Sequence, residues 1–452
     1  MTNAERREGR YLRRKARRET SKQARLGIYD DFARVADTDN LYKSFRKAMK
    51  GVSWKESVQR YEINALRNVI ETKRKLLAGE TLQMGFVEFD INERGKLRHI
   101  KSDHIIKRVV DKCLCENVVV PLLSNSLIYD NGASIKGKGV HFALRRLVRH
   151  LSGYYRSNGR SNEGYALVVD FSKFFDSINH AILFHLQNKI IKDQRIRRLI
   201  YSYITAFGDG VSLGLGSQVS QISAIFYPSI LDHYIKERLR IKYYGRYMDD
   251  LYLIHHDKEY LKKCLKEILR ICGVLKIKTN EKKTRIVKLS GGINFLKGKY
   301  RLMPSGKVLR LPVSDSAKRM KRKLRKFKKL IDEGKMSYDD LRCAYQSWRG
   351  NFRRRFNAFH QVHFADKLYF DLFIEGRDVN EKYKFFDRDY ITPAEYKKRT
   401  GLNYKGDVYI LDSDDNGCRF WVKAKYREIK NFSLPMVCAL KPRKPRRNWR
   451  PS

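Results

Sequence analysis

Three aspartates stand at the ends of strand-like segments, and their side chains are of the type that binds divalent cations. Asp170 follows the apolar run 166–169, and Asp249 and Asp250 lie in the turn of a predicted hairpin, 243–254. Pairing of these strands would bring the three carboxylates to one edge of a sheet. Mg²⁺ prefers oxygen ligands, and paired divalent cations catalyse phosphoryl transfer. The pattern therefore predicts a two-metal site, although an Asp-Asp pair alone in a turn is commonly structural.

Basic residues outnumber acidic residues almost two to one, which indicates the class of partner. The 452 residues include 97 Lys and Arg against 49 Asp and Glu, a formal net charge of +48. Such a surplus is favourable beside a polyanion, because neutralising phosphates releases their counterions. Nucleic acid is therefore the leading partner, with a solvated charged surface or an anionic membrane as alternatives.

Two other features of the sequence argue against particular classes of protein. The sequence has no run of about 18 apolar residues and no apolar N-terminal segment, so we expect no membrane span, no secretory signal and a cytoplasmic protein. Its seven cysteines include no Cys-x-x-Cys pair, which argues against a structural zinc site or a disulfide framework.

Hydrophobic periodicity predicts an α+β protein. Residues 5–25 form a basic arm that is either helical or disordered. A helix is predicted from Ser102 to Val120, ended by Pro121. The other predicted helices are two within 39–78 with a break near Gly51, one long helix at 219–240, and helices within 179–206, 314–333 and 338–373. Strands are predicted at 166–169, 243–247 and 251–254, and hairpins that pair 87–91 with 96–100 and 408–411 with 419–422.

Two stretches resemble the catalytic blocks of reverse transcriptases, above all bacterial ones. Residues 168–178 read VVDFSKFFDSI, and residues 246–254 read RYMDDLYLI. The resemblance spans about residues 28–373 and implies a right-hand polymerase with an antiparallel palm sheet. It implies a basic N-terminal arm at 1–27, fingers at 28–163, a palm with some fingers elements at 164–300, a helical thumb at 301–376, and a small C-terminal extension with a basic tail at 377–452.

The resemblance assigns the chemistry to a small set of residues. Asp170, Asp249 and Asp250 are the expected catalytic ligands of two Mg²⁺ ions, with Mn²⁺ as the alternative metal, and Phe171 is also assigned to the metal site. Lys283 is expected to protonate the leaving pyrophosphate, with Lys282 as the alternative.

A second set of residues is expected to bind the incoming nucleotide. Phe175 stands where the family has an aromatic that excludes a ribose 2′-OH, although a core aromatic also fits this position. Leu215 replaces the Gln common in the family, which predicts loose base selection. The expected nucleotide-binding residues are Lys96, Arg98, Phe175, Leu215, Gly216, Ser220 and Gln221, with Arg98 the first candidate to clamp the triphosphate.

A third set is expected to contact template and primer. The expected residues are Lys136 and Lys138 in a glycine-rich stretch, and Phe295, Leu296, Lys297 and Gly298 in a primer-grip turn. Lys321, Arg322 and Arg325 are expected to bind phosphates from a basic thumb helix.

The resemblance implies an RNA-directed DNA polymerase that uses dNTPs to copy part of a structured noncoding RNA into cDNA. The Ser220-Gln221 pair is similar to that of defence-associated and diversity-generating-retroelement enzymes. Ser217, in place of the Asn usual in diversity-generating enzymes, and the additional C-terminal segment favour anti-phage defence. The alternative of a different class is an inactive RNA-binding protein, against which the intact aspartates argue. The sequence does not predict an oligomeric state.

Overall fold

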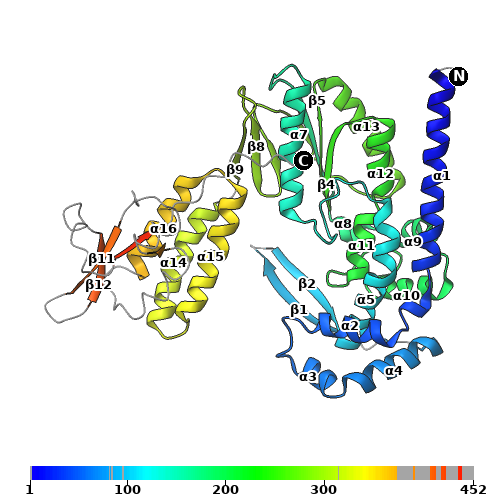
Figure 1. The fold of residues 1–452 in the computed structure, drawn as a ribbon, viewed down its shortest axis with the longest axis horizontal. Coiled ribbons are helices and arrows are strands. Elements are labelled where there is room, and N and C mark those ends of the chain that lie inside the picture. Colours follow the sequence, from blue (N-terminus) through cyan, green and yellow to red (C-terminus); the bar gives the residue numbers. More distant parts are fainter. Residues whose placement is uncertain are drawn as a thin grey trace. The chain divides into compact units, whose positions relative to one another are not determined.

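The computed structural model describes residues 3–80, 82, 85–93, 96–313 and 315–373, together with the strand segments 390–391, 408–413, 419–423 and 436–439 (Figure 1). The chain forms two compact units, Met1–Leu309 and Arg310–Ser452. None of the helices within the described residues is long and apolar enough to cross a lipid bilayer.

The N-terminal part of the first unit is helical and ends in a β-hairpin. The basic arm is a helix, α1 (Asn3–Tyr29). Asp37 caps the next helix, because its side chain accepts a hydrogen bond from Asn40 N at 2.8 Å. The predicted hairpin of 87–91 with 96–100 is confirmed. The elements after α1 are α2 (Thr38–Ala48), α3 (Glu56–Ile63), α4 (Ala65–Ala78), β1 (Phe86–Glu93) and β2 (Lys96–Asp103). The predicted break near Gly51 is present, but a second break at Asn64 gives three helices where two were predicted.

The predicted helix from Ser102 to Val120 is wrong at both ends. Strand β2 continues to Asp103, and α5 (Ile105–Leu114) begins after it. The helical path then continues through a π-helical turn (Cys115–Val119) into α6 (Val120–Leu123), which contains Pro121. Proline is tolerated in the first turn of a helix, where backbone N–H groups have no intrahelical acceptor, so Pro121 does not end this path.

An antiparallel sheet with strand order β4-β5-β3-β6, here called the central sheet, lies at the centre of the first unit. Its side chains alternate between two apolar layers, as the period of a strand requires. Ala166 and Val168 share a buried cluster with α7, whereas Leu167 and Val169 share one with α13. Figure 1 shows α7 and α13 on opposite sides of the sheet. The elements are α7 (Val140–Ser157), β3 (Tyr165–Asp170), β4 (Tyr243–Tyr247), β5 (Asp250–His255), α13 (Lys258–Val274) and β6 (Arg285–Lys288).

Short helices connect β3 to β4 and pack on the α13 side of the central sheet. This layer confirms the predicted helices within 179–206. The single long helix predicted for 219–240 is wrong, because the helical path breaks at Pro228, which has no backbone N–H to donate. The helices are α8 (Phe174–Ser177), α9 (His180–Asn188), α10 (Gln194–Thr205), α11 (Gln218–Phe226) and α12 (Ser229–His233), followed by a π-helical turn (Tyr234–Arg238).

A second small sheet follows, with the order β7 (Ile293–Phe295), β8 (Gly298–Leu302) and β9 (Val308–Pro312). The β7–β8 hairpin turns at Leu296 and Lys297, whose φ angles are 48° and 67°. Residues other than glycine rarely adopt this left-handed conformation, so the turn is held by the packing around it.

The second unit contains three helices that share a buried core. Leu324, Leu341 and Tyr345 pack with Tyr369 and Phe373. The predicted C-terminal hairpin is confirmed by the pairing of β11 with β12, whereas the basic tail from Lys441 lies outside the described residues. The elements are α14 (Ser316–Asp332), α15 (Tyr338–Arg355), α16 (Phe359–Phe373), β10 (Tyr390–Ile391), β11 (Val408–Ser413), β12 (Arg419–Lys423) and β13 (Met436–Ala439).

Candidate active site

The strand register places Asp170 opposite Asp250. These two residues form the last pair between β3 and β5. Directly paired residues of neighbouring strands point to the same face of a sheet, so both carboxylates lie on one face. Asp249 joins them because its carbonyl oxygen accepts a hydrogen bond from Phe171 N at 3.1 Å. The predicted convergence of the three aspartates at one edge of the sheet is therefore present in the backbone.

Two residues between α13 and β6, Asn280 and Lys283, hold the Asp170 carboxylate. Lys283 Nζ lies 3.0 and 2.9 Å from its two carboxylate oxygens. Asn280 donates a hydrogen bond from Nδ2 to Asp170 Oδ2 at 3.2 Å and one from its backbone N to Asp170 O at 2.7 Å. The sequence analysis predicts Lys283 at the leaving group, and the structure places its ammonium on the Asp170 carboxylate.

The acidic cluster changes the ionisation of its own members. Burial, together with the negative charges of Asp249 and Asp170, raises the pKa of Asp250 to about 7. The hydrogen bond to Asp170 raises the pKa of Lys283 above its usual value, although partial burial opposes this shift. Three carboxylates at this spacing are costly to ionise together unless cations neutralise them.

The donor set fits a hard divalent cation. Asp170, Asp249 and Asp250 offer carboxylate oxygens, the ligands that Mg²⁺ prefers. Within the described residues, however, no group of three or more Asp, Glu, His or Cys side chains is placed so that it could hold a metal ion. Burial and the neighbouring negative charges raise the pKa of Asp250, and a bound cation would favour its ionised form instead. The residues therefore supply the chemistry and charge of a cation site.

The segment before α11 is attached directly to the segment after Asp170. Phe175 O accepts a hydrogen bond from Leu213 N at 2.9 Å, and Phe175 itself is half-buried beside Phe174. Gly214 is required here, because a Cβ atom would lie 2.1 Å from the ring of Phe207. Gly216 has a φ of 146°, and a Cβ atom at this position would lie 3.3 Å from Lys101 O of β2. The fold thus brings the predicted gate residue close to the predicted nucleotide-contacting loop.

The predicted contacts from α11 differ in exposure. Ser217 is buried and caps the helix by accepting a hydrogen bond from Ser220 N at 3.4 Å. Ser220 is itself fully buried, whereas Gln221 is exposed. A nucleotide or template strand can therefore contact the Gln221 side chain, while Ser220 contributes to packing.

Asp111 of α5 is a buried residue that the sequence reasoning missed. Its carboxylate oxygens accept hydrogen bonds from Gln218 N at 2.7 Å and Val219 N at 3.0 Å. An acidic group is favourable at this end of α11, where N–H groups lack partners and the helix dipole is positive. Asp111 thereby fixes the start of α11 and the loop that precedes it.

This cap predicts a pH-dependent stability. Burial raises the pKa of Asp111 to about 6, although the two N–H donors favour its ionised form. The folded state then retains a proton that the unfolded state has lost, so the free energy of unfolding falls as pH rises from about 4 to about 6. We expect this loss to be about 2 kcal/mol between pH 4 and pH 7. It should be absent in Asp111→Asn when urea unfolding is measured across that range, and parallel curves for the two proteins would contradict it.

A buried ion pair supports the Asp249-Asp250 turn from behind. Arg246 and Asp232 are both fully buried, with Arg246 NH2 2.6 Å from Asp232 Oδ2. Arg246 also donates from NH1 to Met248 O at 3.1 Å and from NH2 to Ile225 O at 2.8 Å. Met248 has a φ of 52°, a conformation in which this bond helps to hold it. Arg246 is thus a positioning residue, and no pattern in the sequence indicates that its charge is buried.

The predicted glycine-rich stretch lies beside the same strand. Arg246 N donates to Asp130 O at 3.2 Å, and Gly132 N donates to Arg246 O at 2.9 Å. Lys136 is exposed, whereas Lys138 Nζ donates to Tyr129 O at 2.7 Å. Lys136 is therefore free to contact a phosphate, while Lys138 stabilises its own loop.

An ionic network beneath this stretch links it to β5. His150 Nδ1 lies 3.0 Å from Tyr252 OH, and its other ring nitrogen lies 3.5 Å from Asp130 Oδ2. Burial alone would raise the pKa of Asp130, but hydrogen bonds from His150 and Arg146 lower it to about 2. Asp130 therefore stays ionised and ties α7 to the loop next to the acidic turn.

The remaining predicted residues lie at several places. Phe295 is buried against Tyr252, at a ring distance of 5.1 Å, and Leu296, Lys297 and Gly298 follow it in the β7–β8 hairpin. Lys96 and Arg98 belong to β2, but their side chains lie outside the described part of the structure. In the second unit, Arg322 and Arg325 are exposed on α14, and Lys321 lies over the ring of Phe364.

An antiparallel sheet with helices on its faces and aspartates from two adjoining strands at one edge is the reverse transcriptase fold. Residues 92–332 match the family described as reverse transcriptase (RNA-dependent DNA polymerase). This match covers more than half of the 452 residues, and the chain therefore belongs to that family. Reverse transcriptase domains generally use divalent metal ions, usually Mg²⁺.

Similar solved structures include telomerases of two yeasts. The telomerase of Candida albicans in complex with a fragment of telomeric RNA is 12% identical over 64% of this chain and 60% of that chain, with a TM-score of 0.40. Apo telomerase of Candida tropicalis, truncated from its C-terminal domain, is 13% identical over 54% of this chain and 60% of that chain, with a TM-score of 0.39. The match thus spans less than two thirds of either telomerase chain. A comparison with curated proteins finds no similar sequence.

Proposed function

We propose that this protein is an RNA-directed DNA polymerase that adds dNTPs to a primer by two-metal nucleotidyl transfer. The observation that carries the proposal is the register that pairs Asp170 with Asp250 and holds Asp249 against Phe171. When bound, two Mg²⁺ ions would activate the primer 3′-hydroxyl and stabilise the leaving pyrophosphate. Residues 28–163 would then be the fingers, 164–300 the palm and 301–376 the thumb.

The chain's own residues have separate tasks in this reaction. Asp170, Asp249 and Asp250 would hold the metals, while Arg246 keeps the turn that carries two of them in place. Lys283 lies on Asp170 with an exposed side chain, so its ammonium can reach a leaving phosphate and deliver a proton there. Exposed Lys136 would bind template phosphates, and Arg322 and Arg325 would bind the duplex.

Phe175 is proposed to exclude ribonucleotides. Its backbone carbonyl holds the loop at Leu213, and its ring is partly accessible rather than fully buried. We expect Phe175→Ala to incorporate rNTPs at least about tenfold more efficiently relative to dNTPs, because the bulky side chain no longer opposes the 2′-OH. Primer extension with single dNTPs and rNTPs measures this ratio. An unchanged ratio in an active variant would assign Phe175 to packing alone.

The proposed template is part of a structured noncoding RNA, copied into cDNA during anti-phage defence. The net charge of +48 supports a polyanionic partner, and Ser217 in place of Asn favours defence over diversification. A variable-repeat target gene beside the gene would instead support diversification. Sequencing the nucleic acid that copurifies with the protein identifies the template.

Primer extension tests the proposed activity. With Mg²⁺, four dNTPs and an annealed RNA template, the purified protein should extend a DNA primer to the end of the template. Tight RNA binding without extension would favour the inactive RNA-binding alternative.

A further inference from the structure

A cavity of about 590 Å³ lies in the first unit, away from the aspartates, where α1 meets the body of the protein. Its volume is within the range of sites for small organic ligands. The lining comes from α1, from α6 and the turn after it, from the second residue after α9, and from the end of α12 and the π-helical turn that follows it. The lining residues that matter most for ligand binding are Arg17, Arg25, Leu26, Asn125, Ile190 and Glu237.

The α1 wall of this cavity is anchored to the core. Asp30, one residue past α1, accepts hydrogen bonds from Lys192 N at 2.5 Å and Asp193 N at 3.2 Å. Leu26 packs against the main hydrophobic core. Arg17, Ser21 and Arg25 are spaced by four residues, so all three lie on the same face of the helix.

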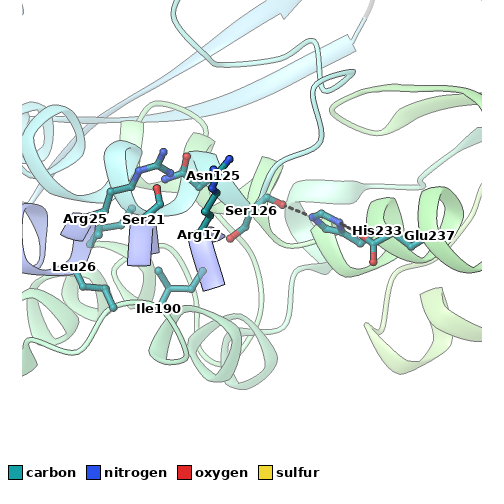
Figure 2. A pocket seen from close by; sticks show the side chains of 10 residues that line it. Arg17, Ser21, Arg25, Leu26, Asn125, Ser126, Ile190, His233 and Glu237 are labelled. Atoms are coloured by element: carbon teal, nitrogen blue, oxygen red, sulfur yellow. Dashed lines mark hydrogen bonds and ion pairs between the residues drawn. The ribbon is translucent and has the colours of Figure 1, made fainter. Parts of the chain in front are cut away.

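The lining has a polar side and an apolar side. Figure 2 shows the side chains of Arg17 and Arg25 near Asn125, with Leu26 and Ile190 opposite them. Neither Arg17 nor Arg25 forms an ion pair within the described residues. The acidic lining residue, Glu237, is engaged by His233, whose Nδ1 lies 3.0 Å from Glu237 Oε1 and whose Nε2 lies 3.0 Å from Ser126 O. Two guanidinium groups thus face the cavity without a negative partner, which favours a phosphate-bearing ligand.

We propose that this cavity binds a nucleotide of an RNA strand, with its phosphates on Arg17 and Arg25 and its base against Leu26 and Ile190. The two arginines are separated by eight residues, about 12 Å along a helix. A strand with repeated phosphates can neutralise both, and exposed Arg13 extends the basic face by one more turn. A free nucleotide could make the same phosphate and base contacts, and the test below distinguishes it from an RNA strand. The choice of RNA as the ligand rests on the proposed function, whereas binding at the cavity does not require catalysis.

Binding of a 5′-fluorescein-labelled 30-nucleotide oligo(U) RNA tests the proposal. Arg17→Ala/Arg25→Ala should bind it about tenfold more weakly near 0.15 M salt, because two charge-assisted phosphate contacts are lost. The slope of log Kd against log salt should fall by about 1.4, at about 0.7 per phosphate of a single strand. The matched control is Lys263→Ala/Lys266→Ala, which removes the same charge from exposed positions of α13 and should bind like wild type.

Two further measurements locate the ligand. Oligo(U) that carries 4-thiouridine should crosslink to α1 or to residues 125–126, and millimolar AMP should not displace it. Equal weakening in the control pair, or no crosslink at the cavity, would overturn the proposal. Displacement of oligo(U) by micromolar AMP would show that the cavity binds a free nucleotide, and it would contradict the proposed binding of an RNA strand. With poly(rA)–oligo(dT) at a saturating concentration, both variants should keep the wild-type kcat for extension, whereas Arg17→Ala/Arg25→Ala should have a raised KM for the template. Failure of this proposal is therefore distinguishable from failure of the polymerase assignment, which would abolish extension by the wild-type protein.

Discussion

Asp249→Ala should lose dNTP incorporation by about a thousandfold or more. Metal ions contribute several kcal/mol to stabilising the charge that develops during phosphoryl transfer, and each 1.36 kcal/mol is a factor of ten in rate. Asp249 is held in the turn beside β3 by the bond from Phe171 N, so its loss removes a ligand without removing a core side chain. Primer extension under single-turnover conditions measures the change.

Asp176→Asn is the matched control for this variant. Asp176 lies six residues after Asp170 in α8, and its side chain is exposed. It removes one carboxylate from the same region without touching the three aspartates, and it should keep close to wild-type activity. If a folded Asp249→Ala protein still incorporates dNTPs at the wild-type rate, that result would contradict a catalytic role for the three aspartates.

Arg246→Met should be the most destabilising single change near the site. It leaves Asp232 as a buried charge whose remaining side-chain partner is the Tyr244 hydroxyl. Removing one member of a buried ion pair commonly costs about 3–5 kcal/mol. Urea unfolding should show this loss, and a variant as stable as wild type would mean that water or a rearranged side chain replaces the guanidinium.

The triple variant Arg246→Met/Asp232→Leu/Tyr244→Phe separates stability from positioning. It removes the whole buried polar cluster, and replacing such a cluster by apolar residues is often neutral or stabilising. Stability should therefore recover, whereas kcat should remain low because the bond from Arg246 to Met248 O is still missing. Recovery of both would assign Arg246 to stability alone.

The arrangement of the aspartates was predictable because it depends on local patterns. An apolar strand that ends in Asp170 and a hairpin that turns at Asp249 leave few ways to pair, and the observed register is the one that puts the acids together. The main helices followed from apolar residues at helical spacing for the same reason.

The residues that the sequence did not reveal act through contacts with residues that are not their neighbours in the sequence. Arg246 and Asp232, which form an ion pair, are 14 positions apart. Asp111 accepts a hydrogen bond from the backbone N–H of Gln218, 107 positions further along the chain. A charged residue in a strand or helix is usually exposed, so neither pattern nor composition identifies a buried one. Pro121 misled the helix prediction because proline is compatible with the first turn of α6.

The central claim is that Asp170, Asp249 and Asp250 form one site for two divalent cations. Electron paramagnetic resonance of Mn²⁺, titrated into protein with primer, RNA template and a non-hydrolysable dNTP analogue, tests it most directly. The account predicts two bound, magnetically coupled ions in the wild-type protein and loss of that coupled signal in Asp249→Ala. Two coupled ions that persist in Asp249→Ala, or no bound Mn²⁺ in an extending wild-type protein, would contradict it.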